Sequence, residues 1–276
     1  MVEGDRLRTY NMEAFCIPIV VDEGHVPGSE GVSKCGRSGR GNRLSRIQLN
    51  RSQPTGSEKA ASLVVDKIMK MWRDKRLIIG IVGAPGSGKT TTSRDIKKRL
   101  QSKGLNCVPL PMDGFHFYRN QLDLFENPVQ AHKRRGAPFT FDAERFISVL
   151  STIRQANGPV FAPDFDHRKK DPREDAICID EAAEVVIVEG NYLLLEEHPW
   201  TKVRPLLDAS VFLDVDLETS MRRVVNRHVE QLGLSREDAL NRVNSNDRPN
   251  ALLIQKSGSR ADFVIKGNRI CENKFG

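Results

Sequence analysis

The residues that could carry chemistry begin with a glycine-rich segment, Gly83-Ala-Pro-Gly-Ser-Gly-Lys-Thr90, which fits the pattern G-x-x-x-x-G-K-[ST]. Glycines in such a segment let successive backbone N–H groups turn inward around a polyphosphate. We expect Lys89 to reach the β- and γ-phosphates of a nucleotide and Thr90 to bind Mg²⁺, while Thr91 either assists at the α-phosphate or caps the following helix. The pattern predicts binding of a nucleoside triphosphate with Mg²⁺ through Gly83, Ala84, Pro85, Gly86, Ser87, Gly88, Lys89, Thr90 and Thr91.

Two carboxylates follow apolar stretches at positions where an α/β enzyme could use them. Asp113 follows the strand predicted at 107–110, which we expect to lie beside the strand that leads into the glycine-rich segment. There it could accept the proton of an attacking hydroxyl group. Glu189 ends an apolar run at 185–188, where it could hold Mg²⁺ through water or orient it. The plainer alternatives are a turn aspartate before Gly114 and a buried structural glutamate.

A pair of arginines could close over a transferring phosphoryl group. The helix predicted at 216–232 has an apolar side formed by Leu217, Met221, Val224, Val225 and Leu232. Arg223 and Arg227 lie four residues apart on its other side. They could stabilise charge on the γ-phosphate, and a solvated basic face is the alternative.

These residues need strands and helices to position them, and the apolar pattern predicts alternating ones. The predicted strands are 76–82, 107–110, 185–189, 211–214 and 262–266. The predicted helices are 57–74, after the capping box Thr55-x-x-Glu58, then 90–102, one after Asp142, 216–232 and 235–244. Residues 111–141 and 161–175 are expected to be irregular. The alternation predicts an α/β fold of the P-loop NTPase class, with a five-stranded parallel sheet flanked by helices.

Motifs of other P-loop classes are absent from the sequence. There is no Asn-Lys-x-Asp, since Asn273-Lys274 has no aspartate after it, and there is no Asp-x-x-Gly, so a Ras-like switch is not indicated. The Leu-Ser-Gly-Gly-Gln signature of transporter ATPases is also missing.

Further motifs occur in a fixed order along the chain. They are Met112-Asp-Gly-Phe-His116, Arg135-Gly-Ala-Pro138, Thr140-Phe-Asp142, Pro163-x-Phe-Asp166-His167, Val188-Glu-Gly-Asn-Tyr-Leu-Leu194-Leu195 and Asn246-Asp-x-Pro-Asn250. With the glycine-rich segment, they resemble the phosphoribulokinase/uridine kinase family over about residues 76–268. The resemblance is greatest to its uridine kinase-like and fructose transport system kinase-like branch, near type I pantothenate kinase.

The resemblance implies an ATP- and Mg²⁺-dependent kinase with a nucleoside/nucleotide kinase-like fold. It implies that Asp113 matches the catalytic aspartate, Glu189 the second acidic residue, and Arg223 and Arg227 the lid arginines. Asn246 and Asn250 fall where relatives close over adenine. Met112 before Asp113, and Gly114-Phe115 after it, are nearer the pantothenate kinase pattern than the uridine kinase one.

Residues for the phosphate acceptor are expected from the two irregular stretches. The candidates are His116, Tyr118, Arg119, Arg134 and Arg135 in the first stretch, and Asp166 and His167 in the second. Several cations favour an acceptor with a carboxylate or phosphate, although Arg134 or Arg135 could instead pair with an acid of the protein. The predicted reaction is transfer from Mg-ATP to a hydroxyl of a small metabolite: a uridine- or cytidine-like nucleoside, a pantothenate-like acid or a sugar. The alternative is a catalytically silent nucleotide-binding regulatory protein.

Composition sets the remaining expectations. The chain has 276 residues, a formal net charge of +7 and 38% hydrophobic residues, and no apolar run is long enough to span a membrane. Residues 1–56, with six Lys or Arg and no acid after residue 30, are predicted to be a disordered basic tail or a targeting segment; 57–276 form the P-loop kinase domain. Early acidic residues argue against a secretory signal. Scattered cysteines favour a cytoplasmic protein, with organelle targeting as the alternative; nucleic acid is a less favoured partner, and a homodimer stays open.

Overall fold

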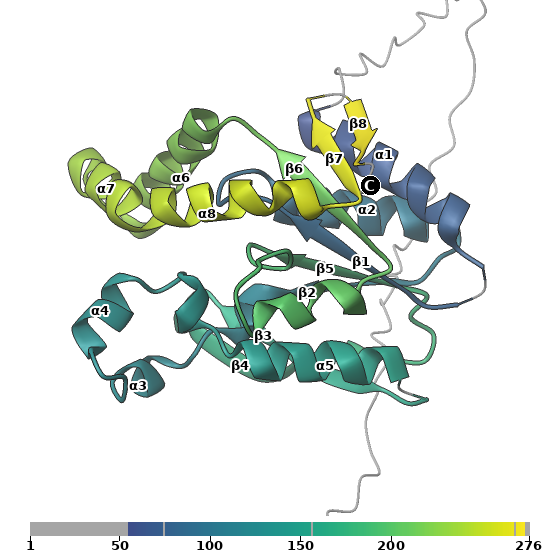
Figure 1. Ribbon diagram of the computed structural model, residues 1–276, viewed down its shortest axis with the longest axis horizontal. Helices are drawn as coiled ribbons and strands as arrows, with labels where there is room; N and C mark the ends of the chain where they lie inside the picture. Colours follow the sequence, from purple (N-terminus) through teal and green to yellow (C-terminus); the bar gives the residue numbers. More distant parts are fainter. Residues whose placement is uncertain (1–54, 74, 156, 268, 274–276) are drawn as a thin grey trace, which may run out of the picture. The chain divides into compact units, whose positions relative to one another are not determined.

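The glycine-rich segment follows the end of an interior strand in a six-stranded sheet (Figure 1). The computed structural model describes residues 55–73, 75–155, 157–267 and 269–273, so the predictions for the basic tail before residue 55 lie outside the described residues. From one edge to the other, the strands are β2 (Cys107–Pro111), β5 (Val185–Gly190), β1 (Leu77–Val82), β6 (Ala209–Asp214), β7 (Phe263–Lys266) and β8 (Arg269–Glu272).

Five of these strands are parallel, as predicted, and the sixth is not. β1 pairs in parallel with β5 and β6, β2 pairs with β5, and β6 pairs with β7. β8 runs antiparallel to β7 at the edge. The sequence did not indicate β8, because it is four residues long and has one apolar face at most. The α/β fold with a parallel sheet is confirmed.

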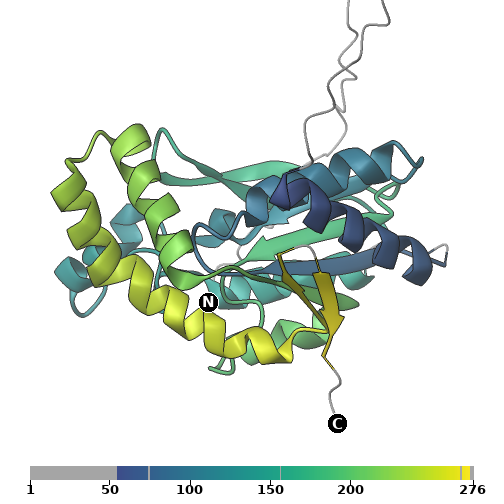
Figure 2. The ribbon, with the colours of Figure 1, turned by 90° about the horizontal axis from the view of Figure 1, so that it is seen from above.

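Helices cover both faces of the sheet (Figures 1 and 2). Leu77, Ile79 and Ile81 of β1 pack in one core with α1 (Gly56–Met71) and α2 (Lys89–Gln101). The alternate residues Ile78 and Val82 pack in the other core with α5 (Ala143–Gln155). All six residues of β1 are buried, which is why the strand reads as continuously apolar rather than alternating.

Helix α1 begins where the sequence predicts. The Thr55 hydroxyl accepts a hydrogen bond from the Glu58 backbone N–H at 3.3 Å, and the Thr55 N–H donates to the Glu58 carboxylate at 2.7 Å. This reciprocal pair is the predicted capping box.

The stretch 161–175, which we predicted to be irregular, forms an antiparallel hairpin instead. Its strands are β3 (Val160–Asp166) and β4 (Asp171–Ile179). Proline and aspartate are depleted in strands, so Pro163 and Pro172 argued locally against pairing. The register shifts between Ala162 and Asp164, which accommodates the first of these prolines. Long-range packing therefore overrides the local preference here.

Two groups of short helices lie at the same end of the sheet (Figure 1, left). We call residues 217–257 the lid: it comprises α6 (Leu217–Leu232), α7 (Arg236–Arg242), the π-helical turn η5 (Val243–Asp247) and α8 (Arg248–Ser257). The other group lies in the segment 112–141 and contains η1 (Met112–Phe115), α3 (Arg119–Leu122), α4 (Pro128–Lys133) and η2 (Pro138–Thr140). Short 3-10 turns elsewhere are η3 (Trp200–Lys202), η4 (Arg204–Leu206) and η6 (Gly258–Arg260).

The lid has a small apolar core of its own. Met221, Val224 and Val225 of α6 pack there with residues of α7, η5 and α8. Leu232, which we assigned to this apolar side, is 45% exposed, because the helix ends there and the buried face continues through His228 instead. Within the part of the chain that the structure describes, no helix is long and apolar enough to span a membrane.

Candidate active site

The phosphate loop, residues 83–90 (the P-loop), connects the end of β1 to the start of α2. Gly86 and Gly88 have φ angles of 80° and 93°, a conformation that glycine adopts without a steric penalty. The Lys89 ammonium folds back over the loop and donates to the carbonyl oxygens of Gly83 at 2.7 Å and Ala84 at 3.1 Å. This is the strand–loop–helix arrangement that the motif requires.

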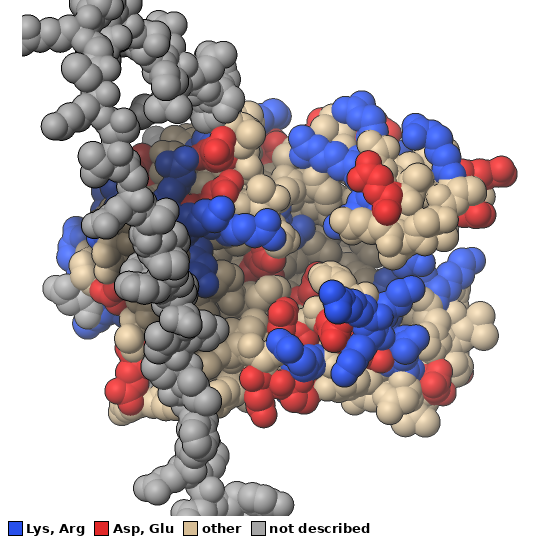
Figure 3. Space-filling model, turned by 180° about the vertical axis from the view of Figure 1, so that it is seen from behind, with Lys and Arg blue, Asp and Glu red and all other residues tan. Residues whose placement is uncertain are grey.

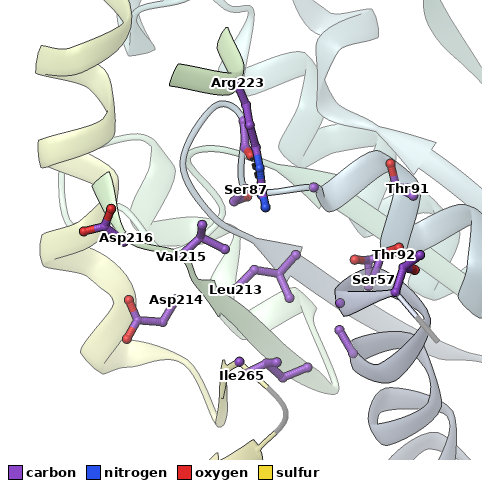
Figure 4. A pocket seen from close by; sticks show the side chains of 16 residues that line it. Ser57, Ser87, Thr91, Thr92, Leu213, Asp214, Val215, Asp216, Arg223 and Ile265 are labelled. Carbon is purple, nitrogen blue, oxygen red and sulfur yellow. Dashed lines mark hydrogen bonds between the residues drawn. The ribbon is translucent and has the colours of Figure 1, made fainter. Parts of the chain in front are cut away.

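Two cavities adjoin the P-loop and share Gly86, Gly88, Thr91 and Arg223 as lining residues. The larger cavity has a volume of about 570 Å³ and is shown in Figure 4. Its walls come from the ends of β6 and β7 on one side and from the first turns of α1 and α2 on the other. They include Leu213, Asp214, Val215, Asp216, Ile265, Ser57 and Thr92. The smaller cavity, of about 260 Å³, is lined by Lys89, Thr90, Asp113, Glu189, Arg223 and Arg227 among others.

The sheet brings the two predicted carboxylates to the smaller cavity. Glu189 lies on β5 between β1 and β2, where it pairs with Ile81 on one side and Pro111 on the other. Asp113 follows Pro111 by two residues. Our expectation that the strand before Asp113 lies directly beside the P-loop strand was wrong, because β5 is inserted between them. The insertion places Glu189 nearer the P-loop strand than Asp113.

Glu189 is a buried carboxylate with few polar neighbours. It is 8% exposed, and one carboxylate oxygen accepts a hydrogen bond from the Ser93 hydroxyl at 3.0 Å. Burial raises the pKa of Glu189, and the charge of Asp113 adds to this rise, while the Ser93 hydrogen bond and the Lys89 charge oppose it. Asp113, by contrast, is exposed to the cavity.

Lys89 is electrostatically linked to the same groups. Burial lowers the pKa of Lys89 to about 8, although the charges of Asp113 and Glu189 oppose this shift and the Arg227 charge adds to it. A lysine in this state loses its proton more readily than an exposed one. An anionic ligand such as a polyphosphate would hold it in the charged form.

The P-loop and its surroundings fit a nucleotide with Mg²⁺. The Ser87 hydroxyl is buried with no hydrogen-bond partner beside the larger cavity, so it has a donor available for a phosphate oxygen. Thr90 and Glu189 line the same smaller cavity, which brings the two predicted metal ligands to one place. Among the described residues, no group of three or more His, Cys, Asp or Glu could hold a metal. Mg²⁺ needs no such cage when substrate phosphates supply most of its ligands.

Arg223 and Arg227, the two arginines that we predicted to close over the phosphates, lie beside the P-loop. Arg223 extends from α6 toward the loop (Figure 4) and donates to the Gly86 carbonyl oxygen at 3.2 Å. Arg227, one helical turn further along, lines the smaller cavity. On the face shown in Figure 3, basic side chains gather on both lobes that flank a hollow at this end of the molecule.

Of the predicted acceptor residues, His116 follows Asp113 by three residues and contacts its backbone. Its ring Nδ1 is 2.8 Å from the Asp113 carbonyl oxygen, and the ring stacks against Phe141 with centroids 3.9 Å apart. Burial lowers the pKa of His116, against the charge of Asp113. The Tyr118 hydroxyl donates to Glu174 at 2.6 Å, and burial raises the pKa of Tyr118 to about 12.

The predicted arginines of this region contact the protein itself. Arg119 and Arg135 both bind the carboxylate of Asp171, at 3.3 Å and 2.8 Å. Arg134 donates to the side-chain oxygens of Asn246 at 3.0 Å and Asn250 at 2.9 Å. The sequence left open whether Arg134 or Arg135 binds an acid of the protein instead of the acceptor. Arg135 does bind an acid, Asp171, whereas Arg134 binds two side-chain amides.

None of the predicted acceptor residues lines either of the two cavities, and neither do the two predicted asparagines. Asn246 and Asn250, expected near adenine, line neither one, because their amides face Arg134 across the lid boundary. Asp166 accepts from the backbone N–H groups of Arg168 and Lys169 and so closes the β3–β4 turn. His167 is exposed beside Phe165 in the same hairpin.

Sequence reasoning missed several residues at the site. Asp214 lines the larger cavity at the end of β6, next to the P-loop strand. The reasoning applied to Asp113 and Glu189, a carboxylate where a parallel strand ends, would have found it. Ser57 lines the same cavity from α1, and Asp171 organises two arginines; neither has a local motif that marks it.

Comparison with known proteins identifies the class of this site. The model of the Phosphoribulokinase / Uridine kinase family matches residues 78–273. The chain belongs to this family. It is therefore an ATP-dependent P-loop kinase, a phosphotransferase whose family works with ATP and Mg²⁺, and the predicted family is confirmed.

Named relatives and a solved structure agree with this assignment. The "Putative uridine kinase C227.14" of Schizosaccharomyces pombe is 37% identical over 200 residues, which cover 71% of this chain and 85% of that protein. The "ATP-dependent kinase-like protein notR'" of Aspergillus versicolor is 40% identical over 163 residues, covering 57% and 94%. The crystal structure of a "putative fructose transport system kinase" from Silicibacter sp. TM1040 has a TM-score of 0.69 at 29% identity, and covers 78% of this chain and 100% of that one.

Proposed function

We propose that this kinase transfers the γ-phosphoryl group of Mg-ATP to a hydroxyl group of a small metabolite. The observation that carries the proposal is the convergence of Lys89, Thr90, Asp113 and Glu189 on one cavity beside the P-loop. Phosphoryl transfer needs a cation at the transferred group, a carboxylate for the acceptor proton and a metal position, and these four side chains have the chemistry for all three.

The nucleoside part of ATP is assigned to the larger cavity. Leu213, Val215 and Ile265 offer apolar contact to a base. Asp214 and Asp216 line the same cavity and offer carboxylate oxygens to ribose hydroxyls. The shared P-loop residues then direct the phosphates toward the smaller cavity.

The residues of the smaller cavity take distinct roles in the transfer. Asp113 accepts the proton of the acceptor hydroxyl while the hydroxyl oxygen forms a bond to the γ-phosphorus. At the same time, the bond between the γ-phosphorus and the bridging oxygen breaks, and ADP leaves. Lys89, Arg223 and Arg227 stabilise charge on the transferring group. Thr90 and Glu189 hold Mg²⁺, which when bound neutralises charge on the phosphate oxygens.

The acceptor enters beside His116, and a neutral polyhydroxyl compound is favoured over an anionic one. Arg119 and Arg135 share the single carboxylate of Asp171, and the guanidinium of Arg134 donates to two neutral amides, so these donors already have partners in the protein. A carboxylate on the acceptor would therefore find fewer free cations than the sequence suggested. A nucleoside, the substrate type in the name of one relative, or a sugar fits this balance of charge better than a pantothenate-like acid.

The test is a product screen with the purified full chain. Mg-ATP is incubated with uridine, cytidine, fructose and pantothenate singly, and phosphorylated products are measured by mass spectrometry. We expect one neutral hydroxyl compound to gain a phosphate with wild-type protein and not with Lys89→Ala. ATP binding without any phosphorylated metabolite, or nucleotide turnover stimulated only by a macromolecule, would instead support the nucleotide-binding regulatory protein.

A further inference from the structure

Three consecutive residues, Arg134 to Gly136, join three parts of the kinase. The Arg134 guanidinium bonds Asn246 and Asn250 in the lid. The Arg135 side chain bonds Asp171 at the start of β4. The Gly136 carbonyl oxygen accepts the hydroxyl of Tyr192 at 2.5 Å, two residues beyond β5. The lid, the start of β4 and the chain just beyond β5 therefore meet the segment 112–141 at one turn.

The lid side of this contact is well ordered by packing. Asn246 and Asn250 are each 4% exposed, and they lie four residues apart in η5 and α8. The Asn246 amide also donates to the Arg135 carbonyl oxygen at 2.9 Å, which reinforces the Arg134 bonds. The half-buried Arg134 thus donates hydrogen bonds to two buried amides, and one of these amides donates a hydrogen bond back to the neighbouring backbone carbonyl.

The same lid touches the P-loop at its other end. A β-carbon at Gly86 would lie 2.3 Å from the Ser220 carbonyl oxygen and 3.0 Å from Val224, so loop and α6 are in direct contact. Ala84 belongs to the apolar core that also holds Val243 of η5 and Ala251 of α8. A displacement of α6 at the P-loop must therefore be accommodated by the helices that carry Asn246 and Asn250.

The chemistry of the contact suits it to break and reform. Arg135 is bound by a carboxylate and by the carbonyl oxygens of Phe117 and Lys170, all outside the lid. Among the ion pairs of the described residues, none involves Arg134. Water can solvate a guanidinium and two neutral amides on separation without leaving a lone buried carboxylate. The contact at Arg134 is therefore one at which the lid and the segment 112–141 can separate without leaving a buried charge unpaired.

We propose that Arg134, with Asn246 and Asn250, couples nucleotide binding at the P-loop to the ordering of the segment 112–141, which carries Asp113 and His116. Arg134 is a positioning residue: nucleotide at the P-loop stabilises the lid in the arrangement that contacts the loop, and the amides of the lid then hold Arg134 and the turn that follows it. The inference rests on the proposed function only in requiring that nucleotide bind at the P-loop. Such coupling is a difference in free energy between two arrangements and can be measured directly.

The test is amide hydrogen exchange on the full chain, with and without saturating Mg²⁺ and the non-hydrolysable ATP analogue AMP-PNP. In wild-type protein, we expect the analogue to slow exchange both in 83–91 and in 119–137. In Arg134→Gln, it still protects 83–91 but no longer changes exchange in 119–137. Asn250→Leu, which removes one acceptor from the lid side, gives the same loss, and Arg94→Gln on the exposed face of α2 behaves as wild type.

The readout is the change caused by nucleotide, which a merely structural role of Arg134 would not remove. The inference is overturned if wild-type protein shows protection in 83–91 alone, or if Arg134→Gln and Asn250→Leu both keep the change in 119–137. If the analogue fails to protect even 83–91 in wild-type protein, the proposed function itself fails. The two failures are therefore distinguishable in one experiment.

Discussion

Gly86 of the P-loop lies against Ser220 of helix α6 so closely that a β-carbon on the glycine would come within 2.3 Å of the serine carbonyl oxygen. The Ser220 carbonyl oxygen belongs to the backbone of α6, so it cannot move aside for a β-carbon as the end of a flexible side chain could. The contact fixes α6, and with it Arg223 and Arg227, at the loop that surrounds the phosphates. Gly86 therefore helps to fix the position of Arg223 and Arg227, although it is far from both arginines in the sequence.

Gly86→Ala should impair nucleotide binding beyond the cost of its backbone angle. Gly104→Ala is the matched control, because Gly104 also has a positive φ, of 84°, but its β-carbon would meet nothing within 4 Å. The left-handed conformation alone costs an alanine about 1–2 kcal/mol. We expect Gly86→Ala to weaken Mg-ATP binding in calorimetry at least tenfold, about 1.4 kcal/mol. Equal affinities of the two variants would contradict the backbone contact.

Nucleotide affinity should depend on pH through Lys89. Burial lowers the pKa of the free Lys89 to about 8, so the ammonium is present below that pH and is lost as the pH rises through it. Bound phosphate favours the charged form and raises the pKa again. Binding should therefore be constant toward neutral pH, weaken above about pH 8, and take up a proton there, as calorimetry in buffers of different ionisation enthalpy can measure.

Lys89→Arg provides the control for this effect, because a guanidinium keeps its charge across the whole range. Its nucleotide affinity should show no proton uptake above pH 8. Proton uptake that persists in Lys89→Arg would assign the titration to another group.

Glu189→Gln should raise the Mg²⁺ concentration needed for half-maximal turnover. The amide keeps the Ser93 contact and the shape of the side chain but removes the charge that holds the metal. The expected loss is on the order of 10–100-fold in apparent metal affinity. Glu181→Gln, at an exposed position before β5, should leave the metal dependence unchanged. Metal titrations of ATPase or kinase activity that coincide for both variants would remove Glu189 from the metal site.

Tyr192→Phe should destabilise the fold at the turn where three parts meet. Tyr192 is fully buried, and its hydroxyl is bonded to the Gly136 carbonyl oxygen. Loss of that bond leaves a carbonyl group without its buried donor and should lower the free energy of unfolding by about 1–3 kcal/mol. Tyr118→Phe removes a hydroxyl whose partner Glu174 is solvent-exposed, so its effect in denaturant unfolding should be smaller. Equal losses would argue against a role of burial.

The sequence was a good guide where the signal is local. β1 and β5 are buried at every position, so each is visible in the sequence as a continuous apolar run. The glycine-rich motif after the first run predicted Lys89 and Thr90, carboxylates after two apolar stretches predicted Asp113 and Glu189, and the fold brings all four to one cavity. Parallel strands end at the same edge of the sheet, which explains why residues distant in sequence meet there.

What the sequence could not show is which segments become neighbours. The pattern of apolar residues within a strand does not indicate which strands are its neighbours, so the position of β5 between β1 and β2 could not be predicted. Arg134 and Asn246 are 112 residues apart, so their contact cannot be inferred from the sequence. An arginine with no partner in the local sequence was therefore interpreted as a binding residue for an anion. The β3–β4 hairpin was missed for a related reason: its prolines are tolerated by packing against η1, where a β-carbon at Gly114 would lie 2.2 Å from the Pro163 carbonyl oxygen.

Turnover of Asp113→Asn with the acceptor found in the product screen is the most direct measure of the proposed chemistry. The amide keeps the shape of Asp113 at the end of β2 but cannot take the hydroxyl proton, so kcat should fall by about 10²–10⁴-fold. The affinity for Mg-ATP should stay near that of wild type, because the P-loop and the larger cavity are untouched. An Asp113→Asn enzyme that phosphorylates this acceptor at the wild-type kcat would contradict the assignment of the base.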